Sequence, residues 1–445
     1  MRSQTPKVAH EILGRPMLGY VLAAARSLNP ERLAVVVGHR ADTVTPLLGE
    51  AVAVAQDQQL GTAHAVLCAQ PALADFDGIL LVVPGDTPLL TANTLMRLVE
   101  KHRESGAGAT LLTACVPDPT GYGRIVRDPA TSHVLKIVEQ KDASAQEQTI
   151  CEVNTGMYAF EAARLFAELG KVGRANAQGE FYLTDIVEVF RREGITVAAF
   201  ETPDHRETLG VNSREQLAEA LAVLQERINR GWMESGVTIV SPGQTFLGPD
   251  VSIGPDTVVW PGTIMEGRTV VGARCRIGPN VRIEGSVVGD DACVEFAVVR
   301  QSQLGQGAQV GPYASLRPGS VMADRSKAGT FVELKNAQVG ADSKVPHLSY
   351  MGDAIIGRDV NIGAGSITCN YDGYDKSETV VEDGAFVGSD TMLIAPVRIG
   401  ENAVIAAGSA IANDVPPDSL AIERAQQRNI EGWAKKRRDK KDQGG

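Results

Sequence analysis

The chain has 445 residues, more than a single hydrophobic core of roughly 250–300 residues supports, so at least two domains are expected. A formal net charge of −11 argues against a general nucleic-acid-binding protein, and a content of 22% charged and 43% hydrophobic residues argues against wholesale disorder. No apolar run approaches the ~20 residues of a membrane span, and residues 1–7 do not resemble a signal peptide. We therefore expect a cytoplasmic protein with no stable membrane association.

Glycine is unevenly distributed along the chain. Residues 1–235 hold 18 of the 46 glycines, and residues 236–445 hold the other 28. This difference predicts a change of architecture near residue 235. The six cysteines are scattered and form no C-x-x-C pair, so we expect reduced thiols.

The first half is typical of an α/β domain. Two apolar runs, LAVVVG at 33–38 and ILLVVPGD at 79–86, are expected to be strands covered on both faces, and the alanine-rich stretch between them, residues 62–70, is helix-like. Ligands of such sheets bind beyond the carboxyl ends of the strands, where Asp86 falls. Taken alone, Asp86 is better explained as an ordinary turn residue. From Ser213 a capping box and apolar residues at three- and four-residue spacing predict a connecting helix over 213–230.

The second half carries a repeat of six residues. Aliphatic residues or methionine recur in one register at Leu247, Ile253, Val259, Met265, Val271, Ile277 and Ile283, in a second at Leu304, Val310 and Leu316, and in a third at Val387, Leu393, Ile399, Ile405 and Ile411. Neither a helix nor a flat strand explains a sustained period of six, whereas a β-helix with one short strand and one turn per hexad does.

The repeat is interrupted twice, at about 318–354 and at 369–377, and both interruptions are expected to be loops on a binding face. The only histidine of the second half, His347, lies in the first of them. A lone histidine is more often structural than catalytic. Because His347 lies outside the hexad repeat, a functional role is favoured. Histidine can accept a proton from an attacking amine near pH 7.

Three motifs give the chain a specific resemblance: KVPHLSYMGD at 344–353, NIGAG at 361–365 and TCNYDG at 368–373. Together with the two halves, they resemble the bacterial family of bifunctional N-acetylglucosamine-1-phosphate uridyltransferases/glucosamine-1-phosphate acetyltransferases. The resemblance implies an α/β Rossmann-like nucleotidyltransferase domain at 1–212, a helical linker at 213–235 and a left-handed parallel β-helix of hexapeptide repeats at 236–445. It also implies a homotrimer with active sites between subunits.

By this resemblance, the β-helix transfers acetyl from acetyl-CoA to glucosamine 1-phosphate, with His347 as the general base and Glu333 as a candidate to orient it. The sugar-phosphate residues implied are Arg317, Lys335, Tyr350, Asn361 and Lys376. The acetyl-CoA residues implied are Asn370, Tyr371, Ser389, Ala407 and Arg424. Arginine and lysine suit a phosphate dianion, and tyrosine and asparagine suit hydroxyl groups.

The same resemblance implies that the first domain couples UTP to the acetylated sugar phosphate and releases pyrophosphate. The nucleotide and sugar residues implied are Lys7, Gln59, Gly61, Thr62, Gly123, Glu139, Asn154 and Asn212. The Mg²⁺ ligands implied are Asp86 and Asn212, whose oxygen atoms suit that ion.

The family opens with a β-strand and a glycine-rich phosphate loop, and Met1 aligns with the last residue of that loop. Either the true start lies upstream, or the chain lacks this strand and loop, in which case we expect impaired uridyl transfer and retained acetyl transfer. Two other interpretations stay open: a nucleotidyltransferase whose β-helix only oligomerises or senses a ligand, and a non-catalytic sugar-nucleotide sensor or structural solenoid.

Overall fold

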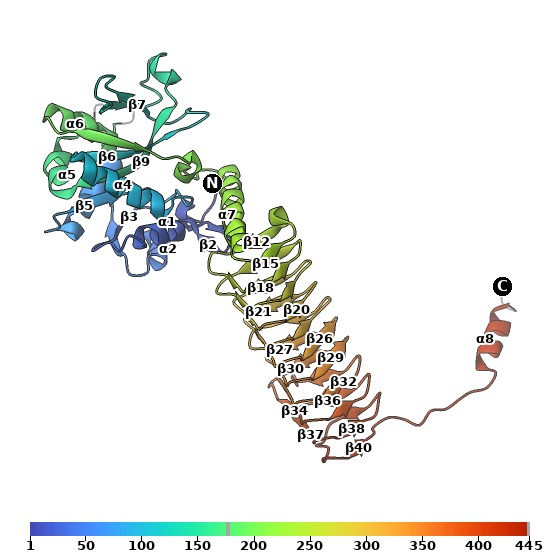
Figure 1. Cartoon of the computed structure of the whole chain (residues 1–445). Coiled ribbons are helices and arrows are strands. Elements are labelled where there is room, and N and C mark those ends of the chain that lie inside the picture. Colours follow the sequence, from blue (N-terminus) through green and yellow to red (C-terminus); the bar gives the residue numbers. More distant parts are fainter. Residues whose placement is uncertain (175–178, 443–445) are drawn as a thin grey trace. The chain divides into compact units, whose positions relative to one another are not determined.

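The computed structural model describes residues 1–174 and 179–442, and the chain divides into two compact units, Met1–Arg227 and Ile228–Gly445. The boundary lies within α7 (Arg214–Glu234), the helix expected over 213–230 (Figure 1). None of the helices in the described residues is both long and apolar enough to cross a bilayer.

The first unit alternates strands and helices along the chain. Its strands are β1 (Glu11–Ile12), β2 (Arg15–Pro16), β3 (Ala34–Val37), β4 (Val52–Ala55), β5 (Ile79–Val82), β6 (Ala109–Cys115), β7 (Arg124–Arg127), β8 (Val134–Val138), β9 (Glu152–Glu161) and β10 (Val197–Glu201). Its helices before α7 are α1 (Met17–Arg26), α2 (Ala41–Val44), α3 (Thr62–Ala69), α4 (Ala92–Ser105), α5 (Ala162–Glu168) and α6 (Ile186–Arg192). The α/β class expected from the sequence is confirmed.

The sheet of this unit is split. Among the described residues, β3 pairs only with β4, and β5 pairs only with β9, at the edge of a mixed sheet of order β10-β6-β9-β7-β8. The expectation that β3 and β5 are covered on both faces is wrong, because nearly all their residues are only half-buried. Both strands line a common cavity of about 1810 Å³.

The cysteine expectation is wrong for one pair. Cys115 ends β6, Cys151 directly precedes β9, and the two form a disulfide with a Cα–Cα distance of 5.1 Å. Residues 36 apart in the sequence become neighbours because β6 and β9 are antiparallel partners. This contact depends on tertiary pairing, which cysteine spacing alone does not encode.

The second unit is a β-helix with three parallel sheets (Figure 1). The first sheet holds β11 (Thr238–Ile239), β14 (Val258–Val259), β17 (Arg276–Ile277), β20 (Cys293–Val294), β23 (Gln309–Val310), β26 (Lys327–Thr330), β29 (Lys344–His347), β32 (Asn361–Ile362), β35 (Phe386–Val387), β38 (Val404–Ile405) and β40 (Leu420–Ala421). The second holds β12 (Thr245–Leu247), β15 (Thr263–Glu266), β18 (Arg282–Glu284), β21 (Val298–Arg300), β24 (Ser315–Leu316), β27 (Glu333–Lys335), β30 (Tyr350–Gly352), β33 (Ile367–Cys369), β36 (Met392–Ile394) and β39 (Ala410–Ile411). The third holds β13 (Ser252–Ile253), β16 (Val270–Val271), β19 (Val287–Val288), β22 (Gln303–Leu304), β25 (Val321–Met322), β28 (Gln338–Val339), β31 (Ala354–Ile356), β34 (Thr379–Val381) and β37 (Val397–Ile399).

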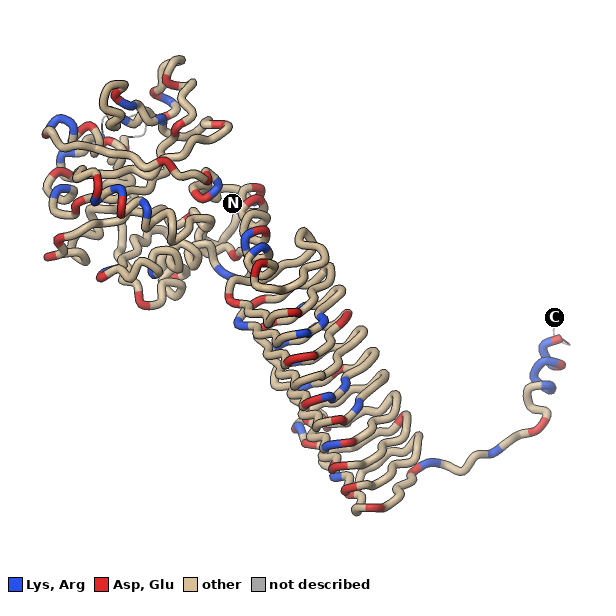
Figure 2. The backbone as a smooth tube through the Cα atoms, in the orientation of Figure 1, with Lys and Arg blue, Asp and Glu red and all other residues tan. Residues whose placement is uncertain are grey.

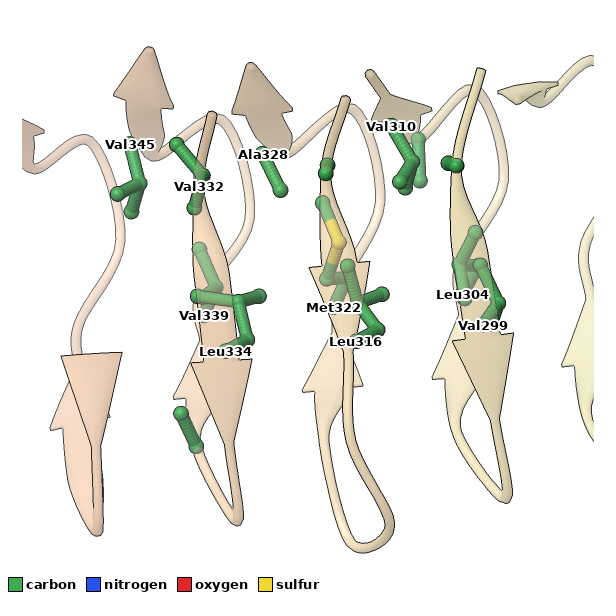
Figure 3. Close-up of a cluster of buried hydrophobic side chains, with 14 of the residues drawn as sticks. Val299, Leu304, Val310, Leu316, Met322, Ala328, Val332, Leu334, Val339 and Val345 are labelled. Atoms are coloured by element: carbon green, nitrogen blue, oxygen red, sulfur yellow. The ribbon is translucent and has the colours of Figure 1, made fainter. Parts of the chain in front are cut away.

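The hexad residues form the core of the β-helix, as the period of six predicts. Figure 3 shows their side chains stacked inside successive coils, among them Leu304, Val310 and Leu316. The residues of the first and third registers are buried as well. Charged residues of both signs are interspersed on the outer surface (Figure 2), and several form ion pairs between adjacent coils.

Only one of the two expected interruptions is an insertion. Between 318 and 354 the coils continue. Lys327 pairs with Lys344, 17 residues later, so this coil is one residue shorter than three full hexads. The expectation of a loop there is wrong. In the second interruption, Thr368 pairs with Leu393, 25 residues later. The segment 370–378 is therefore a true loop. Beyond the coils, the basic tail forms an exposed helix, α8 (Trp433–Asp442).

Burial in β16 provides a matched test of the core. Val271 is 2% exposed and its neighbour Val270 is 45% exposed. We expect Val271→Ala to lower the free energy of unfolding of the β-helix by about 2 kcal/mol, because it removes buried methyl groups and leaves a cavity. Val270→Ala is the control and should change it by less than about 0.5 kcal/mol. Equal effects in urea unfolding would contradict the assignment of the inward face.

Candidate active sites

The cavity of the first unit gathers residues expected to bind the nucleotide and the sugar. Its lining includes Lys7, Gln59, Thr62, Glu139 and Asn154. The other residues of that set do not line it but adjoin residues that do: Gly61 precedes Thr62, Gly123 accepts a hydrogen bond from the Asn154 amide nitrogen, and Asp86 and Asn212 contact Lys7. The structure therefore brings the set together around one cavity.

The two expected magnesium ligands converge on one lysine. The Lys7 ammonium donates to Asp86 Oδ2 at 2.5 Å and to Asn212 Oδ1 at 2.7 Å. One carboxylate oxygen and one amide oxygen thus contact the same positively charged nitrogen, Lys7 Nζ. Oxygen ligands of this kind fit Mg²⁺, which usually takes one or two protein ligands and completes its shell with water and phosphate.

The sugar-binding candidates form a second group, and one of its partners was missed by sequence analysis. Asn154 Nδ2 donates to the buried hydroxyl of Tyr158 at 2.8 Å. Burial, together with the carboxylates of Asp185 and Asp142, raises the pKa of Glu139. Tyr158 lies in β9, four residues after Asn154, so the strand itself presents both side chains to the cavity. An apolar strand pattern gives no sign that a buried tyrosine orients the asparagine.

The turn before α3 explains why glycine occupies position 61. Gly61 has φ +116°, and a Cβ there would lie 2.4 Å from the carbonyl oxygen of Phe181. The Thr62 hydroxyl accepts a hydrogen bond from the Leu183 amide at 2.9 Å, and the Ala63 amide donates to Phe181. The start of α3 is thereby joined to the segment 181–183, which places Thr62 at the cavity.

In the β-helix, three of the acetyl-CoA candidates, Ser389, Ala407 and Arg424, lie in a row along one corner. The carbonyl oxygen of His347 accepts from the Gly365 amide, that of Ala364 from Asp390, and that of Ser389 from Gly408. The carbonyl oxygen of Ala407 accepts from Arg424 Nη1 at 2.7 Å. Each step moves one coil along the axis, about 4.8 Å. We call this line of residues, His347, Ala364, Ser389, Ala407 and Arg424, the corner row.

The sugar-phosphate candidates lie beside the start of this row. Tyr350 begins β30, three residues after the exposed His347, and pairs with Glu333 of β27. Lys335 ends β27, and its ammonium contacts Asp353 at 3.0 Å. Arg317 Nη1 donates to Glu333 Oε1 at 3.1 Å, and the other carboxylate oxygen of Glu333 is not part of this contact, so its role in orienting the imidazole stays a prediction.

The loop 370–378 completes this surface with residues of mixed exposure. Asn370 is 7% exposed and donates through Nδ2 to Asp353 Oδ2 at 2.5 Å. Tyr371 is 59% exposed, and its backbone forms an antiparallel β-bridge with Lys376. Asn361 stands apart from this group, because its register places it beside Lys344 and not beside His347. The remaining candidates thus lie along the second sheet, with Tyr350 at the start of its strand, Lys335 at the end of its own and Asn370 directly after β33.

Gly61 provides a test of the turn at the cavity. We expect Gly61→Ala to destabilise the first unit and weaken UTP binding, because the methyl group adds a backbone clash to an unfavourable φ. The control is Gly106→Ala at the end of α4, with φ +59° and no atom within 4 Å of the added Cβ. That change should cost only about 1 kcal/mol in urea unfolding. If Gly61→Ala costs no more than the control, the packing of this turn is misassigned.

Comparison with known proteins gives a consistent result. The model of the MobA-like NTP transferase domain matches residues 1–145, and that of the bacterial transferase hexapeptide, six repeats, matches residues 250–285 and 378–413. A solved structure of UDP-glucose pyrophosphorylase with UDP-glucose covers 50% of this chain and 91% of its own at 15% identity and a TM-score of 0.40, too distant to support an argument.

Curated relatives match nearly the whole chain. The bifunctional protein GlmU of Heliobacterium modesticaldum is 50% identical and covers 97% of this chain and 94% of its own length. That of Trichlorobacter lovleyi is 48% identical, with 99% and 96% covered. That of Streptomyces coelicolor is 49% identical, with 98% and 92% covered. The family expected from the motifs is confirmed: the chain belongs to the GlmU family of bifunctional proteins.

Proposed function

We propose that the two activities are divided between the two units, acetyl transfer in the β-helix and uridyl transfer in the α/β unit. As a member of the GlmU family, the chain is an enzyme of UDP-N-acetylglucosamine synthesis, a glucosamine-1-phosphate N-acetyltransferase and N-acetylglucosamine-1-phosphate uridyltransferase. The observation that carries the acetyl-transfer proposal is the corner row. It provides an extended track for a long donor such as acetyl-CoA, with one histidine at its end.

In this proposal His347 is the general base. As the amine nitrogen of glucosamine 1-phosphate attacks the thioester carbonyl, a C–N bond forms and the imidazole accepts the proton. The tetrahedral intermediate then expels the thiolate of coenzyme A as the C–S bond breaks, and the thiolate takes up the proton. The exposed position of His347 leaves its imidazole accessible to both substrates. Asn370 and Tyr371 are proposed to lie beside the reacting carbonyl.

The cations around His347 are suited to the acceptor. Arg317, Lys335 and Lys376 supply positive charge for its phosphate, and Tyr350 and Asn361 supply hydrogen bonds for its hydroxyl groups. Since Asn361 lies beside Lys344 in the single chain, we propose that it acts from a neighbouring subunit or at the edge of the site.

An exposed apolar ladder supports assembly into a trimer with sites between subunits. On the same corner as His347, the rings of Tyr313 and Phe331 stack at a centroid distance of 5.3 Å, and the ring of Phe296 lies tilted against Tyr313 at 5.5 Å. Leu348 continues this line on the next coil. All four residues have positive φ, which is unfavourable for bulky side chains, and Leu348 is 62% exposed. A ladder of this kind favours burial against other copies of the chain.

In the first unit, we propose that Lys7 and Gln59 to Thr62 bind UTP and that Gly123, Glu139 and Asn154 bind the sugar. Asp86 and Asn212 would hold Mg²⁺, which would neutralise phosphate charge during transfer. Lys7, now paired with both, would supply positive charge to the same phosphates.

The role of His347 has a direct test. We expect His347→Ala to lower the kcat of acetyl transfer by roughly 10²- to 10⁴-fold, since general-base catalysis is lost. Uridyl transfer by the same variant should not change. His133→Ala removes another exposed histidine, outside the proposed sites, and should leave acetyl transfer intact. Normal acetyl transfer by His347→Ala would refute the assignment.

The split sheet leads to a second prediction. Because β3 and β5 do not pair with each other in the described residues, the sheet beside the nucleotide cavity is interrupted, and we propose that it holds phosphate-binding groups less rigidly. We expect uridyl transfer to be at least roughly 100-fold slower than that of the Heliobacterium relative assayed in parallel, as for the loss of a fixed donor to a developing charge, with comparable acetyl transfer. Equal uridyl turnover by the two proteins would overturn this proposal.

A further inference from the structure

One carboxylate in the β-helix contacts residues of both proposed acetyl-transfer subsites, although neither the motif nor the hexad repeat gives it a role. Asp353 follows β30 directly and has φ +48°, a left-handed conformation that aspartate adopts more readily than most residues. Its side chain is only 16% exposed. A charged side chain this deeply placed requires partners.

Asp353 has three such partners, all donors. Oδ1 accepts from Asn336 Nδ2 at 2.9 Å, and Oδ2 accepts from Lys335 Nζ at 3.0 Å and from Asn370 Nδ2 at 2.5 Å. Burial alone would raise the pKa of Asp353, but these hydrogen bonds outweigh it and hold the pKa below its usual value. The carboxylate in turn raises the pKa of Lys335. The pair is therefore ionised.

The partners come from the two coils on either side of Asp353. Lys335 ends β27 in the preceding coil and belongs to the proposed phosphate subsite. Asn370 follows β33 in the next coil, where the 370–378 loop leaves the repeat, and belongs to the proposed acetyl-CoA subsite. A single oxygen atom, Oδ2, bonds to both. Because an ionised carboxylate only accepts hydrogen bonds, it also fixes which end of the Asn370 amide faces inward.

We propose that Asp353 is a positioning residue that couples the two substrate subsites of acetyl transfer. It holds the Lys335 ammonium at the phosphate subsite and turns the Asn370 carbonyl oxygen outward, toward the donor subsite. Displacement of either partner then disturbs the other through the shared oxygen. This inference rests on the proposed acetyl-transfer function, and it adds a residue outside the set drawn from the family resemblance.

The test is Asp353→Asn in the full chain, with steady-state kinetics for both substrates. The amide keeps the volume, but it loses the charge and one of the two acceptor oxygens. We expect the KM values for glucosamine 1-phosphate and for acetyl-CoA each to rise roughly tenfold or more, as expected for losing hydrogen bonds to a charged group, with a smaller fall in kcat. Uridyl transfer should not change.

Asp342→Asn is the matched control. Asp342 also has positive φ and also pairs with a cation of the preceding coil, Arg325, at 2.7 Å, but its partner is outside the proposed site. Both KM values should match the wild type. If Asp342→Asn changes them as much as Asp353→Asn does, the effect is a general loss of coil stability and the proposal fails.

The effect of a substitution in one subsite on the KM of the other substrate, its cross-effect, distinguishes coupling from local damage. This measurement does not require Asp353→Asn to fold. Lys335→Met should raise the KM for acetyl-CoA several-fold, and Asn370→Ala should raise the KM for glucosamine 1-phosphate several-fold. Where Asp353→Asn folds, both cross-effects should disappear in that background, since interacting residues are not additive. If each variant changes only the KM of its own substrate, the coupling proposal is refuted.

The same measurements distinguish this inference from the function on which it rests. Acetyl transfer that does not depend on His347 would overturn the proposed function. Acetyl transfer that depends on His347 but shows wild-type KM values in Asp353→Asn would overturn the coupling role alone.

Discussion

The β-helix depends on the parallel hydrogen bonding of each coil to the next, with one aliphatic side chain turned inward in every hexad. The inward residues, from Leu247 to Ile411, are buried and form one continuous core. The same register fixes the outside of the molecule, since equivalent positions of successive coils lie directly above one another. Residues that act together can therefore lie along a corner of the coils as well as across a sheet.

Two consequences of this register meet at His347. Along the axis, the corner row brings Ser389, Ala407 and Arg424 into line from three successive coils. Across the second sheet, Tyr350 begins β30 and Lys335 ends the adjacent strand β27. The 370–378 loop adds Asn370 after the end of β33 in the same sheet, and Asp353 joins it to Lys335. An extended donor and a compact phosphorylated acceptor fit these two directions.

The first unit is organised differently, around its cavity. Candidates for the nucleotide and the sugar come from strand ends and from turns such as the one at Gly61. The half-buried β3 and β5 face the same space without pairing to each other. The cavity is bounded by strands that do not form one continuous sheet, whereas the corner of the β-helix is built from stacked coils.

Much of this arrangement was predictable from sequence because it follows from periodicity. The hexads, α7 and the loop 370–378 all appear as patterns within short stretches of sequence. The shortened coil at Lys327 was mistaken for a loop, because the loss of one residue shifts the register as visibly as an insertion does.

Other features could not be predicted from local sequence. The disulfide between Cys115 and Cys151 arises from antiparallel pairing of β6 with β9. The roles of Tyr158 and Asp353 arise from side chains that meet only after folding. No local pattern marks such contacts, because they join residues by tertiary position and not by spacing.

We propose that His347 and the corner row form the acetyl-transfer site. The most direct test of this proposal is a crystal structure of the full chain with glucosamine 1-phosphate and coenzyme A. We expect the pantetheine chain to run along Ala364, Ser389 and Ala407, with the sugar amine within hydrogen-bond reach of the His347 imidazole, about 3 Å or through one water. Coenzyme A bound away from this corner, or an amine far from His347, would contradict it.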